Sequence, residues 1–180
     1  MSEFSLIDLL HQHIRIQRDD VVLGSGDDCA IVEVPSGFQL AISTDTLIAG
    51  RHFPLDTPAH AIGYKSLAVN LSDLAAMGAT PAWVSLALTL PNQDKQWLSE
   101  FARGFAELAE QYNVQLIGGD TTQGELSITM NVMGLLPAGQ GLKRSGALAG
   151  DDIYISNIQG LGAAGFELAN AKVQKRPHLD

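Results

Sequence analysis

The stretch AHAIGYKSLAVNLSDLAAMGATPAWVSLALTL, residues 59–90, combines a helix signal with a strand signal. Residues 59–77 have the Ala-rich composition of a helix, which Gly78 and Pro81 are expected to end. Residues 84–90 alternate between Val or Leu and Ser, Ala or Thr, and this period of two predicts a strand with one buried face. A helix followed directly by a strand indicates a mixed α/β fold.

The rest of the chain extends this pattern in both directions. Helices are expected at residues 5–16, 95–112 and 163–170, and strands at 30–32, 38–44, 114–117, 126–136 and 153–156. Pro35-Ser36-Gly37 is expected to turn the chain in a hairpin. We therefore predict an α/β domain over residues 1–137, with a sheet of about four strands covered by helices on one face. Residues 138–180 would form a connector and the start of an incomplete further domain.

Composition excludes some classes of partner. The formal net charge of −9 argues against a nucleic-acid partner, which would favour a basic face. No apolar run approaches the roughly 20 residues of a membrane span, and the N-terminal residues lack a secretory signal. Cys29 is the only cysteine, so the chain holds no internal disulfide, and we expect a cytoplasmic protein.

Acidic residues occur where the predicted elements end or turn. Asp27 and Asp28 lie in the turn GSGDDCA, Asp45 at the end of a strand beside Ser43 and Thr44, Asp73 on the 59–77 helix, and Asp120 after Gly118-Gly119. Converging carboxylates repel one another unless a cation joins them, and Mg²⁺ prefers such hard oxygen ligands. Taken singly, each of them is also explained by ordinary turn or surface chemistry. Their joint pattern favours a metal site that would hold an anionic ligand.

The remaining motifs give weaker evidence about function. His52 fits a surface loop, and Arg144 fits either a solvated connector or a phosphate contact. The chain has no G-x-x-x-x-G-K-[ST] sequence, so a P-loop is excluded. Gly160–Gly165 matches G-x-G-x-x-G, but no second strand with its acidic residue follows within the sequence. We expect Cys29 to pack as a small buried residue, and no catalytic nucleophile is evident.

Five stretches in order resemble the thiamine-monophosphate kinase family, within the ATP-using synthetases typified by aminoimidazole ribonucleotide synthetase. They are GSGDDCA, ISTDTLIAGRHF, YKSLAVNLSDLAAMGATPAW, LIGGDTT and RSGALAGDDIYIS. The resemblance implies transfer of the ATP γ-phosphoryl group to thiamine monophosphate, with several Mg²⁺ ions. It also implies a homodimer in which the four-stranded sheets of two subunits form a barrel.

The resemblance further implies roles for individual residues. By matching motif, Mg²⁺ ligands would be Asp28, Ser43, Thr44, Asp45, Asp73 and Asp120. ATP contacts would be Gly119, Asp120 and Arg144, and His52 would contact the thiamine substrate. Such transfer needs positioning and charge neutralisation rather than a protein nucleophile.

Other functions stay open on the sequence alone. They are another ATP-using synthetase of the same superfamily, such as a ligase-type or selenophosphate synthetase, a noncatalytic dimerisation or nucleotide-binding module, and, distantly, a dinucleotide-binding oxidoreductase. Family members continue into a second α/β domain, so we expect residues 1–180 alone to show little kinase activity.

Overall fold

A computed structural model describes residues 10, 12–155 and 158–169 of the chain. The chain divides into two compact units, Met1–Arg144 and Ser145–Asp180. The sequence placed this boundary after residue 137, within the connector that follows the last strand of the sheet. The larger unit contains the sheet and both long helices, and the two units are described separately below.

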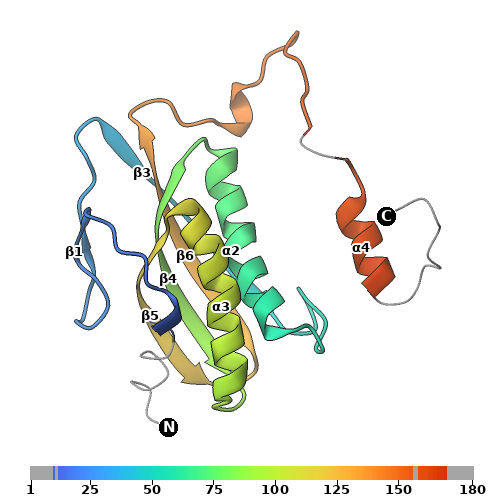
Figure 1. Cartoon of the computed structure of the whole chain (residues 1–180). Coiled ribbons are helices and arrows are strands. Elements are labelled where there is room, and N and C mark those ends of the chain that lie inside the picture. Colours follow the sequence, from blue (N-terminus) through green and yellow to red (C-terminus); the bar gives the residue numbers. More distant parts are fainter. Residues whose placement is uncertain (1–9, 11, 156–157, 170–180) are drawn as a thin grey trace. The chain divides into compact units, whose positions relative to one another are not determined.

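The larger unit is built on one mixed four-stranded sheet (Figure 1). Its strands are β3 (Phe38–Ile48), β4 (Thr80–Leu90), β5 (Gln115–Gln123) and β6 (Ser127–Pro137), in the spatial order β3-β6-β4-β5. β6 pairs antiparallel with both β3 and β4, whereas β4 and β5 are parallel. The predicted α/β fold with about four strands is confirmed.

Two long helices, α2 (Ala59–Ala76) and α3 (Lys95–Tyr112), cover one face of this sheet, as Figure 1 shows. Asp94 caps α3 by accepting hydrogen bonds from the backbone N–H groups of Gln96 and Trp97. The helices cross closely at Gly63, which has no side chain. A Cβ at this position would lie 2.0 Å from the Phe101 carbonyl oxygen, too close for any larger residue. We call the face that α2 and α3 cover the helix face, and the opposite one the back face.

A short hairpin of β1 (Val21–Leu23) and β2 (Ile31–Val32) contributes to a second apolar cluster. The cluster is centred on Ala82, Trp83 and Ile117, and Val21 and Val32 pack against it. Trp83 is fully buried, and its indole N–H donates to the Asp20 carboxylate over 3.0 Å. The hairpin is thereby linked to the sheet through a polar contact as well as through apolar packing.

Several sequence-based boundaries are wrong. The expected hairpin between residues 30–32 and 38–44 does not form, because β2 pairs with β1 while β3 pairs over its whole length with β6. β3 continues to Ile48 and β5 to Gln123, so Asp45 and Asp120 lie inside strands rather than at their ends. Residues 153–155 form no strand. Half of the expected helix at 5–16, residues 5–9 and 11, lies outside the described residues, and residues 14–16 are not helical.

The second unit contains one described helix, α4 (Leu161–Ala169), which the sequence placed at 163–170. Gly160 precedes it with a φ of 90°, a conformation that favours glycine. This supports a turn-forming role for the first glycine of the G-x-G-x-x-G match. Of the helices in the described ranges, none combines the length and the apolar composition needed to cross a membrane.

Asp20 provides a test of how the hairpin is held. Arg18 donates two hydrogen bonds to the Asp20 carboxylate, and these bonds lower the pKa of Asp20 below its ordinary value near 3.8. Burial of the carboxylate raises the pKa, whereas the hydrogen bond from Trp83 lowers it further. A lowered pKa means that the ionised Asp20 carboxylate stabilises the folded protein. This stabilisation is fully present above the pKa of Asp20 in the unfolded chain, and it is lost as the pH falls through the pKa in the folded protein.

We predict that Asp20→Asn lowers the free energy of unfolding by about 1 kcal/mol at neutral pH, since hydrogen bonds to a charged group are lost. The difference between variant and parent should shrink below about pH 4, where Asp20 becomes protonated in the unfolded chain. Urea unfolding at neutral and acidic pH measures it, with the exposed neighbour substitution Asp19→Asn as a control. A difference independent of pH would contradict this account.

Candidate functional site

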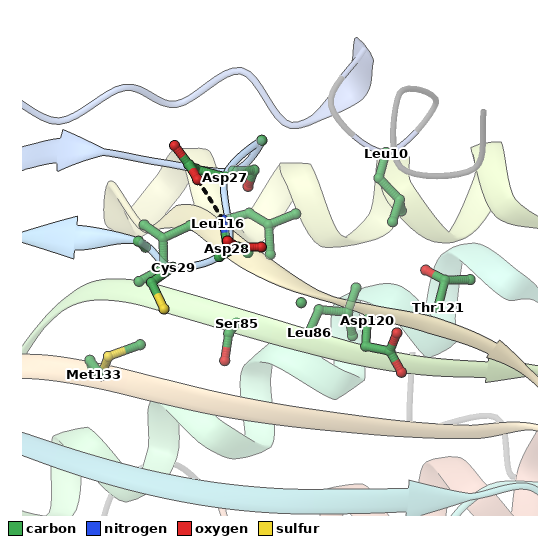
Figure 2. A pocket seen from close by; sticks show the side chains of 16 residues that line it. Leu10, Asp27, Asp28, Cys29, Ser85, Leu86, Leu116, Asp120, Thr121 and Met133 are labelled. Carbon is green, nitrogen blue, oxygen red and sulfur yellow. Dashed lines mark hydrogen bonds between the residues drawn. The ribbon is translucent and has the colours of Figure 1, made fainter. Parts of the chain in front are cut away.

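A cavity of about 730 Å³ lies beside the edge strand β5 (Figure 2). One wall is the glycine-rich turn before β2, which carries Asp27, Asp28 and Cys29. The other wall is formed by β4 and β5, with Ser85 and Asp120 among the lining residues. The predicted ligands Asp28 and Asp120 are thus 92 positions apart in the numbering (120 − 28) and yet line the same cavity.

Glycine exposes the backbone on both walls. A Cβ on Gly26 or on Gly118 would meet no atom within 4 Å. Gly119 differs, because its Cβ would lie 1.9 Å from the Leu86 carbonyl oxygen of the neighbouring strand. Gly119 is therefore required for the close approach of β5 to β4, whereas Gly118 leaves room for a ligand to approach the main chain.

The charge in this cavity is acidic. Asp27, Asp28 and Asp120 line it, and no Lys or Arg is among the described lining residues. One carboxylate oxygen of Asp27 accepts the backbone N–H of Asp28 at 2.9 Å, so Asp27 is partly engaged in shaping its own turn. An anionic ligand in this cavity would require a cation between it and the carboxylates.

A second group of predicted ligands lies between β3 and α2. The Ser43 hydroxyl donates to the Asp73 carboxylate over 2.7 Å and so links the strand to the helix. Asp45 is two residues along β3 from Ser43, and side chains two apart on a strand share a face. Both Asp45 and Asp73 are exposed. The structure therefore brings Ser43 together with Asp73 and directs Asp45 to the same side.

The two groups lie on opposite faces of the sheet. Asp45 is paired with Met130, whose buried side chain is on the helix face. Asp120 of β5 is opposite the exposed Ala87 of β4, and Ala87 is in turn opposite Thr129 of β6. The Thr129 hydroxyl lies 2.8 Å from the hydroxyl of Thr46, the residue that follows Asp45 on β3. Directly opposed residues share a face, and neighbours along a strand alternate. Asp45 accordingly lies on the helix face and Asp120 on the back face.

Thr44 is also on the back face. Its hydroxyl oxygen accepts a hydrogen bond of 2.6 Å from the Asn131 side-chain amide. β3 therefore sends Ser43 and Asp45 to one face and Thr44 to the other. Sequence spacing grouped all three because they are consecutive, but the pleat of a strand separates them.

The donor set suits Mg²⁺ in chemical type, because every predicted ligand offers carboxylate, hydroxyl or carbonyl oxygen. Within residues 10, 12–155 and 158–169, however, no three His, Cys, Asp or Glu side chains come close enough to hold one ion. The predicted ligands form a cavity group, Asp28 and Asp120, and a strand–helix group, Ser43, Asp45 and Asp73. Their role as metal ligands stays a prediction.

His52 lies in a tight turn after β3. Its Nδ1 atom accepts the backbone N–H of Ile48 at 2.9 Å, and its own backbone N–H donates to the Ile48 carbonyl at 3.0 Å. This arrangement fixes the neutral tautomer in which Nε2 carries the proton, so the outer ring nitrogen is a hydrogen-bond donor. The Lys65 ammonium donates to the His52 carbonyl over 2.6 Å, which adds a cation beside the turn.

Arg144 is exposed in a 3-10 turn, Arg144–Gly146, and is not among the residues that line the cavity. The connector is held near the C-terminal end of α2, since the Leu142 N–H donates to the Met77 carbonyl at 3.1 Å. That end of α2 also carries Asp73. The predicted ATP contacts are thus Gly119 and Asp120 at the cavity and Arg144 in the connector.

Some features differ from the sequence-based expectation. Cys29 is exposed and lines the cavity, so the prediction that it packs as a small buried residue is wrong; it lies in the glycine-rich turn before β2. Sequence reasoning also missed Lys65, Ser85 and Asn131. The alternation of Ser127 to Asn131 against apolar residues indicated a polar face, but the register that sets Asn131 opposite Thr44 was not available from the sequence.

Comparison with known proteins identifies the class. Residues 26–136 match the family model "AIR synthase related protein, N-terminal domain", which is more than half of the chain. The chain therefore belongs to the AIR synthase related family and contains its N-terminal domain. The matched range includes the strand–helix group and every cavity-lining residue except Leu10 and Ser25.

Within that family, the resemblance to thiamine-monophosphate kinase is confirmed. The chain is 51% identical over 178 residues to the thiamine-monophosphate kinase of Salmonella typhimurium, covering 99% of this chain and 55% of that protein. It superimposes on the crystal structure of thiamine-monophosphate kinase from Stenotrophomonas maltophilia with a TM-score of 0.84 and 45% identity, covering 99% of this chain and 57% of the other.

A third relative has been solved with ligands. AaThiL, complexed with AMPPCP and TMP, superimposes with a TM-score of 0.72 and 28% identity, over 98% of this chain and 55% of that one. The chain spans about half the length of the curated relatives it matches.

Gly119 tests the geometry of the cavity wall. We predict that Gly119→Ala lowers the free energy of unfolding by about 1–3 kcal/mol, because its Cβ would collide with the Leu86 carbonyl and push β5 away from β4. Gly118→Ala is the matched control, since its Cβ would meet open space and leave the stability nearly unchanged. Urea unfolding compares the two, and equal stability of both variants would contradict the close approach of β5 to β4.

Proposed function

We propose that this chain is the nucleotide-binding part of an enzyme that transfers the γ-phosphoryl group of ATP to thiamine monophosphate and forms thiamine diphosphate. The proposal is supported by relatives of about 50% identity that are named thiamine-monophosphate kinase. It is also supported by the complex of AaThiL with AMPPCP and TMP, which pairs an ATP analogue with TMP in a relative. The single unpaired cysteine supports a cytoplasmic site of action.

The observation that carries the proposal is the cavity beside β5. Phosphate groups bind readily where glycine lets the main chain approach them, and Gly26 and Gly118 provide such surfaces on facing walls. The acidic lining would repel ATP alone. It suits ATP that carries a divalent cation, because Asp28 and Asp120 can then supply ligand oxygens.

We further propose that Asp28 and Asp120 hold Mg²⁺ at the cavity. Ser43, Thr44, Asp45 and Asp73 are the further ligands that the sequence predicts, and their oxygen donors suit the same ion. When bound, Mg²⁺ would neutralise charge on the transferred phosphoryl group and orient the phosphates. Arg144 is proposed as an ATP contact, since a guanidinium binds phosphate oxygens in a bidentate manner.

The chain itself would supply positioning. The acceptor is a phosphate that is already ionised at neutral pH, so the transfer requires no strong general base and no protein nucleophile. His52 would donate from Nε2–H to the acceptor substrate, and Lys65 adds positive charge at the same turn.

The alternative functions differ from the proposed one in the molecule that accepts the phosphoryl group, or they involve no such transfer. Another synthetase of the same superfamily would release ADP with a different acceptor, and a binding module would bind nucleotide without turnover. ADP release by the intact protein, measured with thiamine monophosphate and with other phosphate acceptors, separates these possibilities. A dinucleotide-binding oxidoreductase is disfavoured, because the glycine motif at Gly160 lies in the second unit rather than in the matched domain.

Calorimetric titration of the 180-residue chain with ATP tests the proposal directly. We predict that ATP binds in the presence of Mg²⁺ and loses most of its affinity when the metal is chelated. Asp120→Asn and Asp28→Asn should each weaken Mg·ATP binding about tenfold or more, as expected for groups at a metal site. Asp56→Asn, an exposed carboxylate outside this cavity, is the matched control. Equal affinity with and without Mg²⁺ would refute the proposal.

We also propose that two copies of the chain associate through the back face of the sheet. Leu40 and Ile42 are 37% and 59% exposed there, opposite Leu135 and Met133. Exposed apolar patches of this kind are typical of interaction sites. We predict that sedimentation velocity finds a dimer and that Ile42→Asp shifts it to the monomer, while Ile155→Asp in the second unit does not. A monomeric parent chain would contradict the association.

A further inference from the structure

Asn70 carries a buried polar atom without a hydrogen bond. Asn70 is 1% exposed on α2, and its Nδ2 atom donates to the Ser66 carbonyl over 2.8 Å. That carbonyl can only accept, so it fixes which end of the Asn70 amide is the nitrogen. The Oδ1 atom at the other end has no partner among the residues that the structure describes. A buried acceptor of this kind is costly unless a water or a cation binds it.

Asn70 shares a face of α2 with Asp73. Residues three apart on a helix are neighbours, with Cβ atoms about 5–6 Å apart. This face is directed at β3, because the Ser43 hydroxyl donates to the Asp73 carboxylate over 2.7 Å. Ser66 is one turn earlier on the same face and is also buried, but its hydroxyl donates to the Ile62 carbonyl at 2.6 Å. The helix therefore satisfies the Ser66 hydroxyl and leaves the Asn70 oxygen unsatisfied.

Asn70 lies level with Asp45 of β3. Two hydrogen bonds align the helix with the strand, since Asp73 accepts from Ser43 and Lys65 donates to a carbonyl in the turn that follows β3. α2 therefore runs antiparallel to β3. Starting from the contact of Asp73 with Ser43, Asn70 is about 4.5 Å along the helix and Asp45 about 7 Å along the strand, in the same direction. Asn70 and Asp45 thus belong to one neighbourhood on the helix face.

The surroundings of Asn70 are rich in hydrogen-bond acceptors. Ionised Asp45 and Asp73 can only accept, and the Ser43 hydroxyl already donates to Asp73. Neighbouring carboxylates repel each other, and a cation between them removes this repulsion. A divalent cation of the Mg²⁺ type suits the group, because it prefers oxygen ligands and keeps several of its own waters. Such a water is a strong donor, which is the kind of group that the Asn70 oxygen requires.

We propose that Asn70 is a positioning residue of the strand–helix group, whose Oδ1 atom accepts a hydrogen bond from a water of a divalent cation held by Asp45 and Asp73. This inference rests on the proposed function and adds to it a residue outside the predicted ligand set. Asn70 contacts the water rather than the cation. Because its amide is buried and bonded to its own helix, it holds that water, and through it the cation, at one place beside β3.

Urea unfolding in the presence of EDTA measures what the unsatisfied oxygen does to the metal-free chain. Leucine has nearly the shape of asparagine and no polar atom, so Asn70→Leu removes the oxygen and still fills the space. We expect its unfolding midpoint to equal or exceed that of the parent chain. Asn70→Ala removes the same oxygen but leaves a gap in the packing, so its midpoint should be lower. The two variants thus lack the same acceptor and differ in stability.

Manganese binding to the same 180-residue chains tests the inference itself. Mn²⁺ replaces Mg²⁺ in the presence of ATP, and the EPR signal of free Mn²⁺ is compared with that of a sample containing ATP alone. We expect both Asn70 variants to bind Mn²⁺ about tenfold more weakly than the parent chain, the loss typical of groups that hold a metal through its outer shell. Ser66→Ala, the matched control, removes a buried hydroxyl on the same face of α2 and should leave the affinity unchanged. Asn70→Leu should cost no further affinity in an Asp45→Asn background, because both substitutions act on one cation.

Two results would overturn the inference. Parent-like Mn²⁺ affinity in Asn70→Leu would show that the amide oxygen binds an ordinary water, and a loss confined to Asn70→Ala would show that affinity follows stability rather than the oxygen. Mg·ATP binding by the parent chain judges the proposed function separately. If the parent chain binds Mg·ATP and the Asn70 variants keep full metal affinity, the inference alone fails and the proposed function stands. If the parent chain does not bind Mg·ATP, the proposed function fails and the inference fails with it.

Discussion

The pairing of β3 with β6 decides on which side of the sheet every polar side chain of β3 lies. The ladder runs without a break from Phe38 opposite Pro137 to Ile48 opposite Ser127. A shift of one residue would exchange the two faces and expose the buried Leu47. Burial of Leu47, Ile128, Met130 and Val132 therefore fixes the register, and with it the positions of Ser43, Thr44 and Asp45.

That register makes the candidate site a composite of two surfaces. Asp28 and Asp120 line a cavity at the back-face edge, whereas Ser43, Asp45 and Asp73 lie on the helix face. Each group has oxygen donors, but among the described residues neither brings three carboxylate, imidazole or thiol groups together. The same sheet presents exposed apolar side chains on its back face. The proposed ligand cavity and the proposed partner surface thus both involve the back face of the same sheet.

Sequence analysis was most successful where one helix or strand has a clear periodicity. Residues 95–112 were predicted as a helix with the bounds that α3 has, because an apolar stripe runs along it; the structure adds Asp94 as its N-cap. The helix that ends before Gly78 was predicted within one residue, because Gly78 and Pro81 follow it. These elements settle the fold class, since each buries a face that must meet a sheet.

Features that depend on contacts between distant segments were predicted less well. The partner of β2 could not be derived, because a two-residue strand has no periodicity and its pairing with β1 depends on the Trp83 cluster. Asp45 and Asp120 were assigned to strand ends because polar residues there resemble turns, but cross-strand pairing continues through them. Residue type led to the prediction that these side chains belong to one site, and this stays a prediction, whereas their division between two faces of the sheet follows from register alone.

Paramagnetic broadening by Mn²⁺, used in place of Mg²⁺ together with ATP, tests the central claim most directly. The amide resonances of Asp28, Gly119 and Asp120 should broaden at the lowest metal concentrations, followed by those of Ser43, Asp45 and Asp73. Resonances of Glu107 and Glu110 on the exposed side of α3 should stay sharp. Sharp signals at Asp28 and Asp120, while other carboxylates broaden, would show that the metal and the nucleotide bind elsewhere.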